Sequence, residues 1–234
     1  MTATATALPR TSRAATGRNL AAFAARAWKV TVTGADSVPH DGPVLLASYH
    51  SAYLDGLLLA AAAPRPVHLL ASAELFAPPF ARLLRGTGQI PVDHELPDRH
   101  ALLTAVGVLE AGGAVGVFPE GVRGTCDVPR GRLETAYLAA LSGAVVVPVA
   151  ILGARPAGAR RDSLPRLRTP IDVVLGEPVD IRVGGDPRRR SVLTRSGERL
   201  RQTLADHVLD ACAATGRTLH DPLTDPTHQI RSDS

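Results

Sequence analysis

Short apolar runs, each followed by a turn with polar residues, restrict the fold of this chain more than any other feature. The runs occupy residues 44–47, 67–71, 114–118 and 144–152, and segments with helical patterns lie between them. Short, continuous apolar runs of this kind predict buried strands. Strands that alternate with helices favour a parallel sheet, so we predict an α/β fold with a central mixed, largely parallel sheet flanked by helices.

The length of 234 residues suits one main domain with a helix at each end. We predict an amphipathic basic helix over residues 13–29 and the main domain over residues 30–215. Within the domain we also predict a helix over residues 133–141 and short strands over residues 172–175 and 179–181, and the domain ends in a predicted C-terminal helix over residues 189–215. Residues 1–12 are predicted to be a disordered N-terminus and residues 216–234 a flexible tail, because neither segment has enough apolar residues to form a core.

The predicted N-terminal helix has two interpretations. Its larger apolar side chains, Leu20, Phe23 and Trp28, are expected to share one face, and the segment is rich in basic residues. A helix of this kind can lie in the interface of a membrane, with its aromatic side chains among the lipid head groups. The alternative is that the helix packs against the domain, and the sequence leaves both interpretations open.

The turn after the first apolar run contains the best candidate for catalysis. His50 follows this run, and Asp55 comes five residues later, at the start of a helix predicted over residues 53–63. A carboxylate in that first turn can reach one imidazole nitrogen, fix the tautomer and raise the basicity of the ring. The other nitrogen is then free to remove a proton from a substrate hydroxyl. A structural histidine at the end of the strand is the alternative.

Two further turns place polar residues at predicted strand ends. One contains Asp93 and His94, and the other contains Glu120 and Arg123. In parallel α/β sheets, ligands bind where the carboxyl ends of the strands meet the loops that follow them. The three turns together therefore indicate one site at one edge of the sheet.

At these residues the sequence resembles the glycerophospholipid acyltransferase family of the lysophosphatidic acid acyltransferase type. Four ordered blocks support the resemblance: an Asn-His-x4-Asp pattern, a Gly-x-Ile-Pro-Val-Asp-Arg-like block, a Phe-Pro-Glu-Gly-Thr-Arg-Ser block and a Val-Pro-Val strand. They are matched by His50, Ser51 and Asp55, by Gly88 with residues 90–93, by residues 118–121 with Arg123, and by residues 147–149. The resemblance covers roughly residues 28 to 180.

The resemblance implies an O-acyltransferase of phospholipid biosynthesis. Such an enzyme moves a fatty acyl group from acyl-CoA or acyl carrier protein to the hydroxyl of a lysophospholipid, with 1-acylglycerol-3-phosphate as the family's default acceptor. By the resemblance, His50 is the catalytic base and Asp55 orients it. The chain lacks the Gly-x-Ser-x-Gly elbow of serine hydrolases, so we predict direct attack on the thioester without a covalent acyl-enzyme.

The resemblance also implies which residues bind the acceptor. Glu120 would hold its hydroxyls, Gly121 would let the backbone approach closely, and Arg123 would bind its phosphate or another acidic head group. A structural ion pair of Arg123 with Glu120 or Asp93 is the alternative for that arginine.

Four further residues are candidates for accessory roles. Ser51 follows the proposed base, Asp93 is expected to order its loop, and His94 lies beside it. Arg130 stands in a loop where the family often has a basic residue, and it is a candidate contact of the acyl donor.

Four positions depart from the family pattern. Tyr49 stands where the family usually has Asn, His94 where it often has Arg, and Val122 and Gly124 replace Thr and Ser. Histidine is mostly neutral at pH 7, whereas arginine offers a permanent, bidentate charge to an acceptor phosphate. The departures therefore leave open another acceptor, such as an amino-lipid or a secondary-metabolite hydroxyl. A non-catalytic lipid-binding protein of the same fold is a further alternative.

Charge and composition restrict the partners. The net charge of +4 favours anionic partners such as coenzyme A, phospholipid head groups and an anionic membrane surface, and no nucleic-acid-binding module is recognisable. Cys126 and Cys212 are too few for a disulfide scaffold, and an inert thiol is expected at Cys126. The spacing of His94 and His100 fits no standard metal site, so we predict no metal and no cofactor beyond the acyl co-substrate.

The hydropathy of the chain bears on its location. No apolar stretch approaches the roughly 20 residues that span a bilayer, and the N-terminus lacks the apolar core of a signal peptide. The sequence therefore predicts a cytoplasmic protein, peripheral on the inner face of the cell membrane.

Overall fold

The computed structural model describes most of the chain. The described residues are 8–79, 81–93, 98–119, 128–155, 163–186 and 189–218, with residues 128–131 described as backbone only. Most of the predicted N-terminal segment 1–12 and of the predicted tail 216–234 lies outside the described residues.

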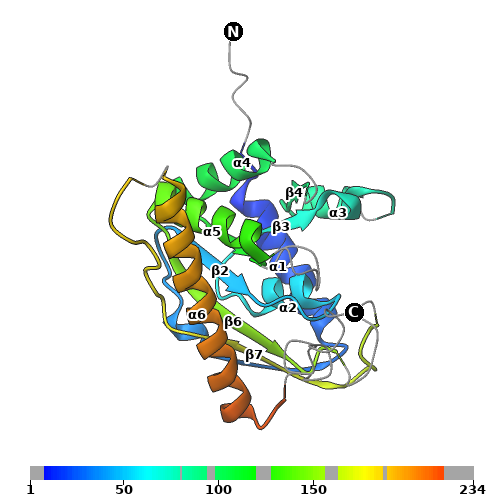
Figure 1. Ribbon diagram of the computed structural model, residues 1–234. Helices are drawn as coiled ribbons and strands as arrows, with labels where there is room; N and C mark the ends of the chain where they lie inside the picture. Colours follow the sequence, from blue (N-terminus) through cyan, green and yellow to red (C-terminus); the bar gives the residue numbers. More distant parts are fainter. Residues whose placement is uncertain are drawn as a thin grey trace, which may run out of the picture.

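One sheet of seven strands forms the centre of the described structure, in the order β1-β7-β6-β2-β5-β3-β4 (Figure 1). The strands are β1 Lys29–Thr33, β2 Val44–Ser48, β3 Val67–Ser72, β4 Ile90–Val92, β5 Ala114–Val117, β6 Val145–Leu152 and β7 Pro170–Leu175. Strands β2 to β6 are parallel to one another, whereas β7 pairs antiparallel with β6 and parallel with β1. The predicted mixed, largely parallel sheet is confirmed.

Strand β2 is central because its residues are apolar on both faces. Val44 and Leu46 belong to one hydrophobic cluster, and Leu45 and Ala47 to another on the opposite face of the sheet. Successive side chains of a strand point to opposite faces, so an uninterrupted apolar run requires cover on both sides. All five residues of β2 are buried, and this buried position fixes the point at which the chain leaves the sheet.

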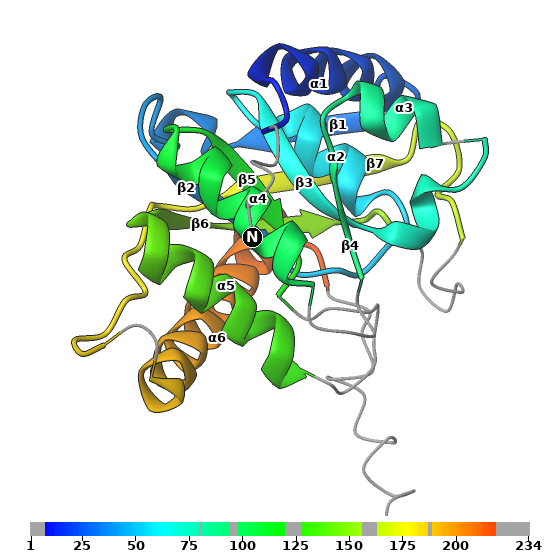
Figure 2. The same cartoon turned by 90° about the horizontal axis from the view of Figure 1, so that it is seen from above.

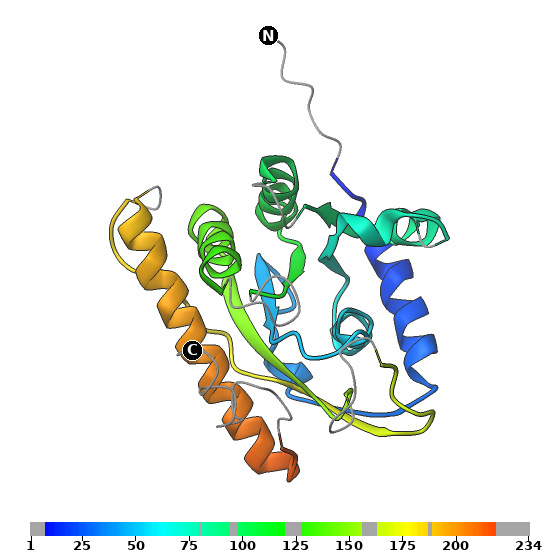
Figure 3. The same ribbon diagram turned by 45° about the vertical axis from the view of Figure 1, so that its right-hand side comes forward.

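Helices cover both faces of the sheet (Figures 2 and 3). On one face lie α1 and α2, with the short α3 beside α1, and on the other lie α4, α5 and α6. The helices are α1 Thr11–Ala25, α2 Asp55–Ala62, α3 Ala81–Gly86, α4 Arg99–Glu110, α5 Val128–Ser142 and α6 Arg190–Thr215, with short 3₁₀ helices η1 Ala35–Ser37 and η2 Ala73–Phe76.

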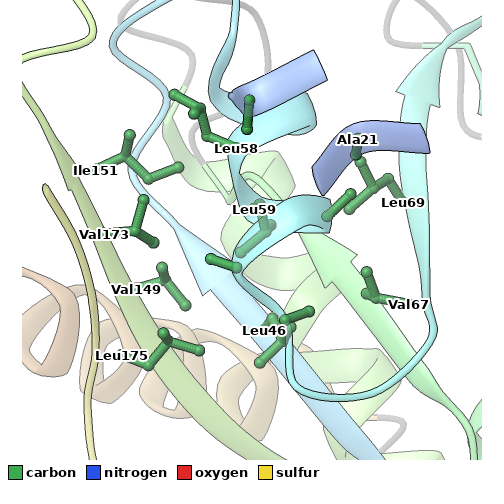
Figure 4. Close-up of a cluster of buried hydrophobic side chains, with 14 of the residues drawn as sticks. Ala21, Leu46, Leu58, Leu59, Val67, Leu69, Val149, Ile151, Val173 and Leu175 are labelled. Atoms are coloured by element: carbon green, nitrogen blue, oxygen red, sulfur yellow. The ribbon is translucent and has the colours of Figure 1, made fainter. Parts of the chain in front are cut away.

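Helix α2 is held by apolar contacts with the sheet. Figure 4 shows Leu58 and Leu59 of α2 in one cluster with Leu46 of β2, Val149 of β6 and Val173 of β7. Full burial of a leucine side chain stabilises the fold by about 1.5–3 kcal/mol. Because α2 cannot shift without exposing these side chains, its first residue occupies a fixed position at the carboxyl edge of the sheet.

The N-terminal helix differs from its prediction in its end and in its buried face. It ends at Ala25, Trp28 lies beyond it, and Lys29 begins β1. The face buried against the domain consists of small residues, namely Ala14, Gly17, Ala21 and Ala25. A Cβ added at Gly17 would lie 2.9 Å from Cβ of Thr87, so small side chains are what allow this close approach.

The expectation that Leu20, Phe23 and Trp28 share one face is therefore wrong. Leu20 and Phe23 point away from the domain, and Phe23 exposes 70% of its surface. Trp28 instead packs on the core cluster. The helix packs against the domain through one face and presents larger apolar residues on the other.

Three further predictions in the second half of the chain have different outcomes. The terminal helix is confirmed as α6, which continues without a break through Gly197. The strand predicted over residues 179–181 is wrong, because only an isolated bridge between Val179 and Val146 forms there. The predicted helix over 133–141 is present but begins earlier, at Val128, so the backbone of Arg130 lies in α5 and not in the predicted loop.

Candidate active site

His50 and Asp55 form the pair that the sequence predicts. Nδ1 of His50 lies 3.1 Å from Oδ2 of Asp55. A carboxylate only accepts hydrogen bonds, so Nδ1 is the donor and Nε2 keeps a lone pair. Asp55 is fully buried, whereas 18% of the His50 side chain remains exposed. This geometry orients the imidazole and leaves it accessible to a substrate.

The turn between β2 and α2 is organised around the Asp55 carboxylate. Oδ2 also accepts the backbone N–H groups of Ser51 at 2.6 Å and Ala52 at 2.7 Å. Asp55 is the first residue of α2, where the helix dipole favours a negative charge. A buried carboxylate needs such donors because burial otherwise disfavours its charged form.

The same contacts define what the turn can do during catalysis. The N–H groups of Ser51 and Ala52 are already engaged by Asp55, so they are not free to bind a developing oxyanion. Oδ1 of Asp55 is buried and has no hydrogen-bond partner among the described residues. The carboxylate therefore directs its hydrogen bonding through one oxygen, toward the turn and the imidazole.

Phe118 contacts the imidazole from the neighbouring strand. The two ring centroids are 4.5 Å apart, and the rings are tilted by 37°. Phe118 follows β5, whose last residue, Val117, is paired with Ala47 of β2. Residues at matching levels of adjacent parallel strands are close neighbours, and here this pairing brings Phe118 to His50. Phe118 belongs to the Phe-Pro-Glu-Gly-Thr-Arg-Ser block of the family, but its contact with His50 was not predicted from the sequence.

Asp93 lies at the same edge of the sheet but farther from the histidine. It follows β4, and two strands, β5 and β3, separate β4 from β2. Asp93 is exposed, and its backbone N–H donates to Oδ2 of Asp98 at 3.2 Å. Oδ1 of Asp98 caps α4 by accepting the N–H of Ala101 at 2.9 Å. The role of Asp93 in ordering its loop stays a prediction.

Several predicted site residues lie outside the described residues. These are His94, Glu120, Gly121 and Arg123, together with the side chain of Arg130 and the departing positions Val122 and Gly124. The described chain reaches Pro119, which is buried directly after Phe118 at the carboxyl edge. The acceptor-binding roles of Glu120 and Arg123 therefore remain predictions.

Tyr49, which departs from the family pattern, is partly buried against the hydrophobic core. It packs against a cluster of buried residues from β6 and α6, including Leu152 and Val208, on the side of the sheet opposite α2. This contact gives the substitution a structural reason.

The described residues show neither a metal-binding group nor a helix that could span a membrane. They contain no group of three or more His, Cys, Asp or Glu residues arranged to hold a metal ion. Within the same part of the chain, no helix combines the length and the hydropathy that crossing a membrane would need.

Comparison with known proteins identifies the family. The sequence model of the acyltransferase family matches residues 29–152, which run from β1 to the end of β6 and include His50, Asp55 and Phe118. The match covers more than half of the chain, and the protein therefore belongs to the acyltransferase family. The predicted family resemblance is confirmed.

Two relatives define the similarity further. The 1-acyl-sn-glycerol-3-phosphate acyltransferase of Bacillus subtilis is 32% identical over 126 residues, which are 53% of this chain and 63% of that protein. The matched part thus spans somewhat less than two thirds of that relative. The crystal structure of the 1-acyl-sn-glycerophosphate (LPA) acyltransferase PlsC from Thermotoga maritima has a TM-score of 0.59 at 21% identity, over 86% of this chain and 79% of that one. This likeness supports the fold.

Proposed function

We propose that the protein transfers a fatty acyl group from a thioester to the hydroxyl of a lysophospholipid, with 1-acylglycerol-3-phosphate as the acceptor. The observation that supports this most strongly is the contact between His50 and the buried Asp55 within the family-matched region. The similarity to the Bacillus subtilis 1-acyl-sn-glycerol-3-phosphate acyltransferase supports the choice of acceptor. The donor is acyl-CoA or acyl carrier protein.

The proposed reaction needs one general base. Nε2 of His50 takes the proton of the acceptor hydroxyl while its oxygen attacks the thioester carbonyl carbon. The new C–O bond forms, the C–S bond breaks, and the proton passes from the imidazolium to the departing thiolate. Asp55 stabilises the imidazolium through Oδ2. No acyl-enzyme is needed because a thiolate is a good leaving group.

Positioning can contribute more than the base. A general base typically accelerates a reaction about 10²–10⁴-fold. Holding the hydroxyl next to the thioester can lower the barrier by about 7–11 kcal/mol. We assign the positioning of the acceptor to Glu120, Gly121 and Arg123. We assign contact with the acyl donor to Arg130.

We further propose that the protein is cytoplasmic and acts at the inner face of the cell membrane. A lysophospholipid acceptor and its product reside in a bilayer, so the enzyme must meet them there. The outward-facing Leu20 and Phe23 of α1 support contact of this helix with lipid.

The test is release of free thiol from acyl-CoA, measured with a panel of acceptors. We expect 1-acylglycerol-3-phosphate to give the highest kcat/KM, and His50→Ala to lower kcat about 10²–10⁴-fold. His100→Ala is the matched control, because His100 is exposed on α4 at the opposite face of the sheet.

Three results would contradict the proposal in different ways. A higher kcat/KM with an amino-lipid or a secondary-metabolite hydroxyl would replace the acceptor. Unchanged turnover by His50→Ala would remove the base. Lipid binding without thiol release from any acceptor would favour a non-catalytic lipid-binding protein.

A further inference from the structure

Two exposed leucines lie in the turn that leads into β7. Leu164 exposes 58% of its surface and Leu167 exposes 74%. Scattered single apolar residues are ordinary on a protein surface. Two such residues within one short turn instead form an exposed apolar patch, and such patches mark interaction sites. Residues 163–169 are referred to below as the leucine turn.

Hydrogen bonds to the segment between α1 and β1 hold the leucine turn in place. Nε1 of Trp28 donates to the carbonyl of Pro165 at 3.1 Å, and the N–H of Arg168 donates to the carbonyl of Ala27 at 2.7 Å. Pro165 itself is buried. In Figure 3 the chain entering β7 lies beside the C-terminal end of α1. Because the backbone is already fixed, a partner would not have to order it on binding.

Basic residues lie in the leucine turn and in the segment bonded to it. Arg166 and Arg168 belong to the leucine turn, Arg26 and Lys29 lie in the segment bonded to it, and all four are exposed. The leucine turn and the segment from Arg26 to Lys29 include no aspartate or glutamate. Each basic residue near an anionic lipid surface strengthens binding to that surface. Exposed apolar side chains accompanied by basic residues fit an anionic bilayer better than a neutral one.

Another exposed leucine shows that this environment is particular. Leu209 on α6 exposes 65% of its surface, but exposed Asp206 and Asp210 lie on the same helix beside it. Those carboxylates would be repelled by anionic lipid. Exposure alone therefore does not distinguish the leucine turn, whereas exposure combined with positive charge does.

The leucine turn lies at the same edge of the sheet as His50. Leu152, the last residue of β6, is paired with Asp172 of β7, so Pro170 extends beyond the carboxyl end of β6. Strand β6 is the neighbour of β2, and β7 is the neighbour of β6. Two strand spacings amount to roughly 10 Å across the sheet. The leucines therefore project from the edge at which the catalytic pair opens.

We propose that the leucine turn docks on an anionic membrane surface. Leu164 and Leu167 enter the boundary between head groups and acyl chains, and Arg166 and Arg168 bind lipid phosphates. Docking would turn the His50 edge of the sheet toward the bilayer. The benefit of this orientation rests on the proposed function, whereas the docking itself does not require catalysis.

Vesicle co-sedimentation tests the apolar part of the proposal. The full chain is mixed with vesicles of phosphatidylcholine containing phosphatidylglycerol, and the double variant Leu164→Gln with Leu167→Gln is compared with the wild type. We expect an affinity at least about tenfold lower for the variant. The control variant, Leu103→Gln with Leu209→Gln, removes two exposed leucines on the opposite face and should bind as the wild type does.

A second variant tests the charges. Arg166→Gln with Arg168→Asn removes both arginines of the leucine turn, and asparagine suits the φ of 64° at position 168. Binding to the anionic vesicles should fall, whereas the weaker binding to phosphatidylcholine alone should not change. Equal affinities of the wild type and both turn variants would overturn the proposal and favour a protein partner for this surface.

Thiol release separates failure of docking from failure of the proposed function. With a short-chain acceptor below its aggregation concentration, the leucine variant should turn over as the wild type does, and it should lose activity only when the acceptor is in vesicles. Vesicle binding that depends on the leucines without any thiol release would leave docking intact and refute the acyltransfer reaction. Thiol release from vesicle-bound acceptor that does not depend on the leucines would refute docking alone.

Discussion

A charged side chain lies at each end of helix α2, and the two side chains have different roles. Asp55 begins the helix at the carboxyl edge of the sheet, and Arg65 follows its end at the amino edge. Both side chains bond to backbone groups, since Asp55 accepts from the N–H groups of Ser51 and Ala52 and Arg65 donates to carbonyls. Only Asp55 also bonds to a titratable side chain, that of His50.

Arg65 stabilises the loops near the end of α2 by bonding to their backbone carbonyls. Its Nη1 donates to the carbonyls of Pro39 at 3.0 Å and Gly42 at 2.9 Å, and its Nη2 donates to the carbonyl of Gly112. Burial lowers the pKa of Arg65 below its ordinary value, and the charge of Asp41 partly offsets this. A charged side chain bonded to backbone alone is typical of scaffold, whereas a charged side chain that also orients a partly exposed ring is typical of a site. We therefore expect substitution of Asp55 to lower activity and substitution of Arg65 to lower stability.

The largest expected effect is on activity at the Asp55 end. Asp55→Asn keeps a carbonyl oxygen for the N–H groups of the turn but removes the negative charge that stabilises the imidazolium. We expect kcat for thiol release to fall about 10²–10⁴-fold. Urea unfolding should detect only a small loss of stability. A variant with near-normal kcat would show that Asp55 is scaffold as Arg65 is, and the distinction between the two ends would be lost.

The reverse outcome is expected at the Arg65 end. Arg65→Met leaves three backbone carbonyls without their charged donor, so the free energy of unfolding should fall by about 2–4 kcal/mol. Urea denaturation gives this value, and kcat measured well below the unfolding midpoint should stay within a factor of a few of the wild type. A large fall in kcat with unchanged stability would contradict the scaffold role.

Phe118 contacts the imidazole of His50 but forms no hydrogen bond to it, so its effect should be smaller than that of Asp55. Phe118→Leu keeps an apolar side chain but removes the ring that lies 4.5 Å from the ring of His50. A looser imidazole should lower kcat by about tenfold, with a smaller change in the KM for the acceptor. The matched control is Phe76→Leu, which alters a buried phenylalanine of η2 and should leave kcat unchanged.

The smallest effect is expected for a charge pair on the surface. Arg182 lowers the pKa of Asp180 to about 2 from an ordinary value of 3.8, mainly through a side-chain hydrogen bond. The pair's contribution to stability is therefore present above pH 3.8 and is lost as the pH falls through about 2. Both side chains are largely exposed, so Arg182→Met should cost less than about 1 kcal/mol at neutral pH. An NMR titration of Asp180 should show its pKa returning toward 3.8, and an unchanged pKa would contradict the assigned cause.

The central strands β2, β5 and β6 were predictable because each is a continuous apolar run that is buried on both faces. Strand β2 and strand β6 each match their predicted ranges to within one residue. The contact between His50 and Asp55 was predictable for the same reason, since a strand end and a helix start fix the spacing of the two residues. The prediction of a strand over residues 179–181 was wrong because a short apolar segment can pack in the core and form a single bridge without joining the sheet.

Contacts that depend on shape or on backbone partners were not predictable. The buried face of α1 is made by Ala14, Gly17 and Ala21, and hydropathy ranks such small residues below Leu20 and Phe23. Close approach of the backbones decided which face turned inward. Arg65 binds carbonyls from separate loops, and backbone carbonyls have no signature in the sequence.

The indole of Trp28 has a practical consequence. It joins two segments that are 137 positions apart, and it is the chain's sole tryptophan. Its fluorescence therefore originates at a single known junction, directly beneath the residues proposed to meet lipid. Loosening of that junction would appear as a red-shifted emission maximum, so the wild-type protein contains its own optical probe and needs no added label.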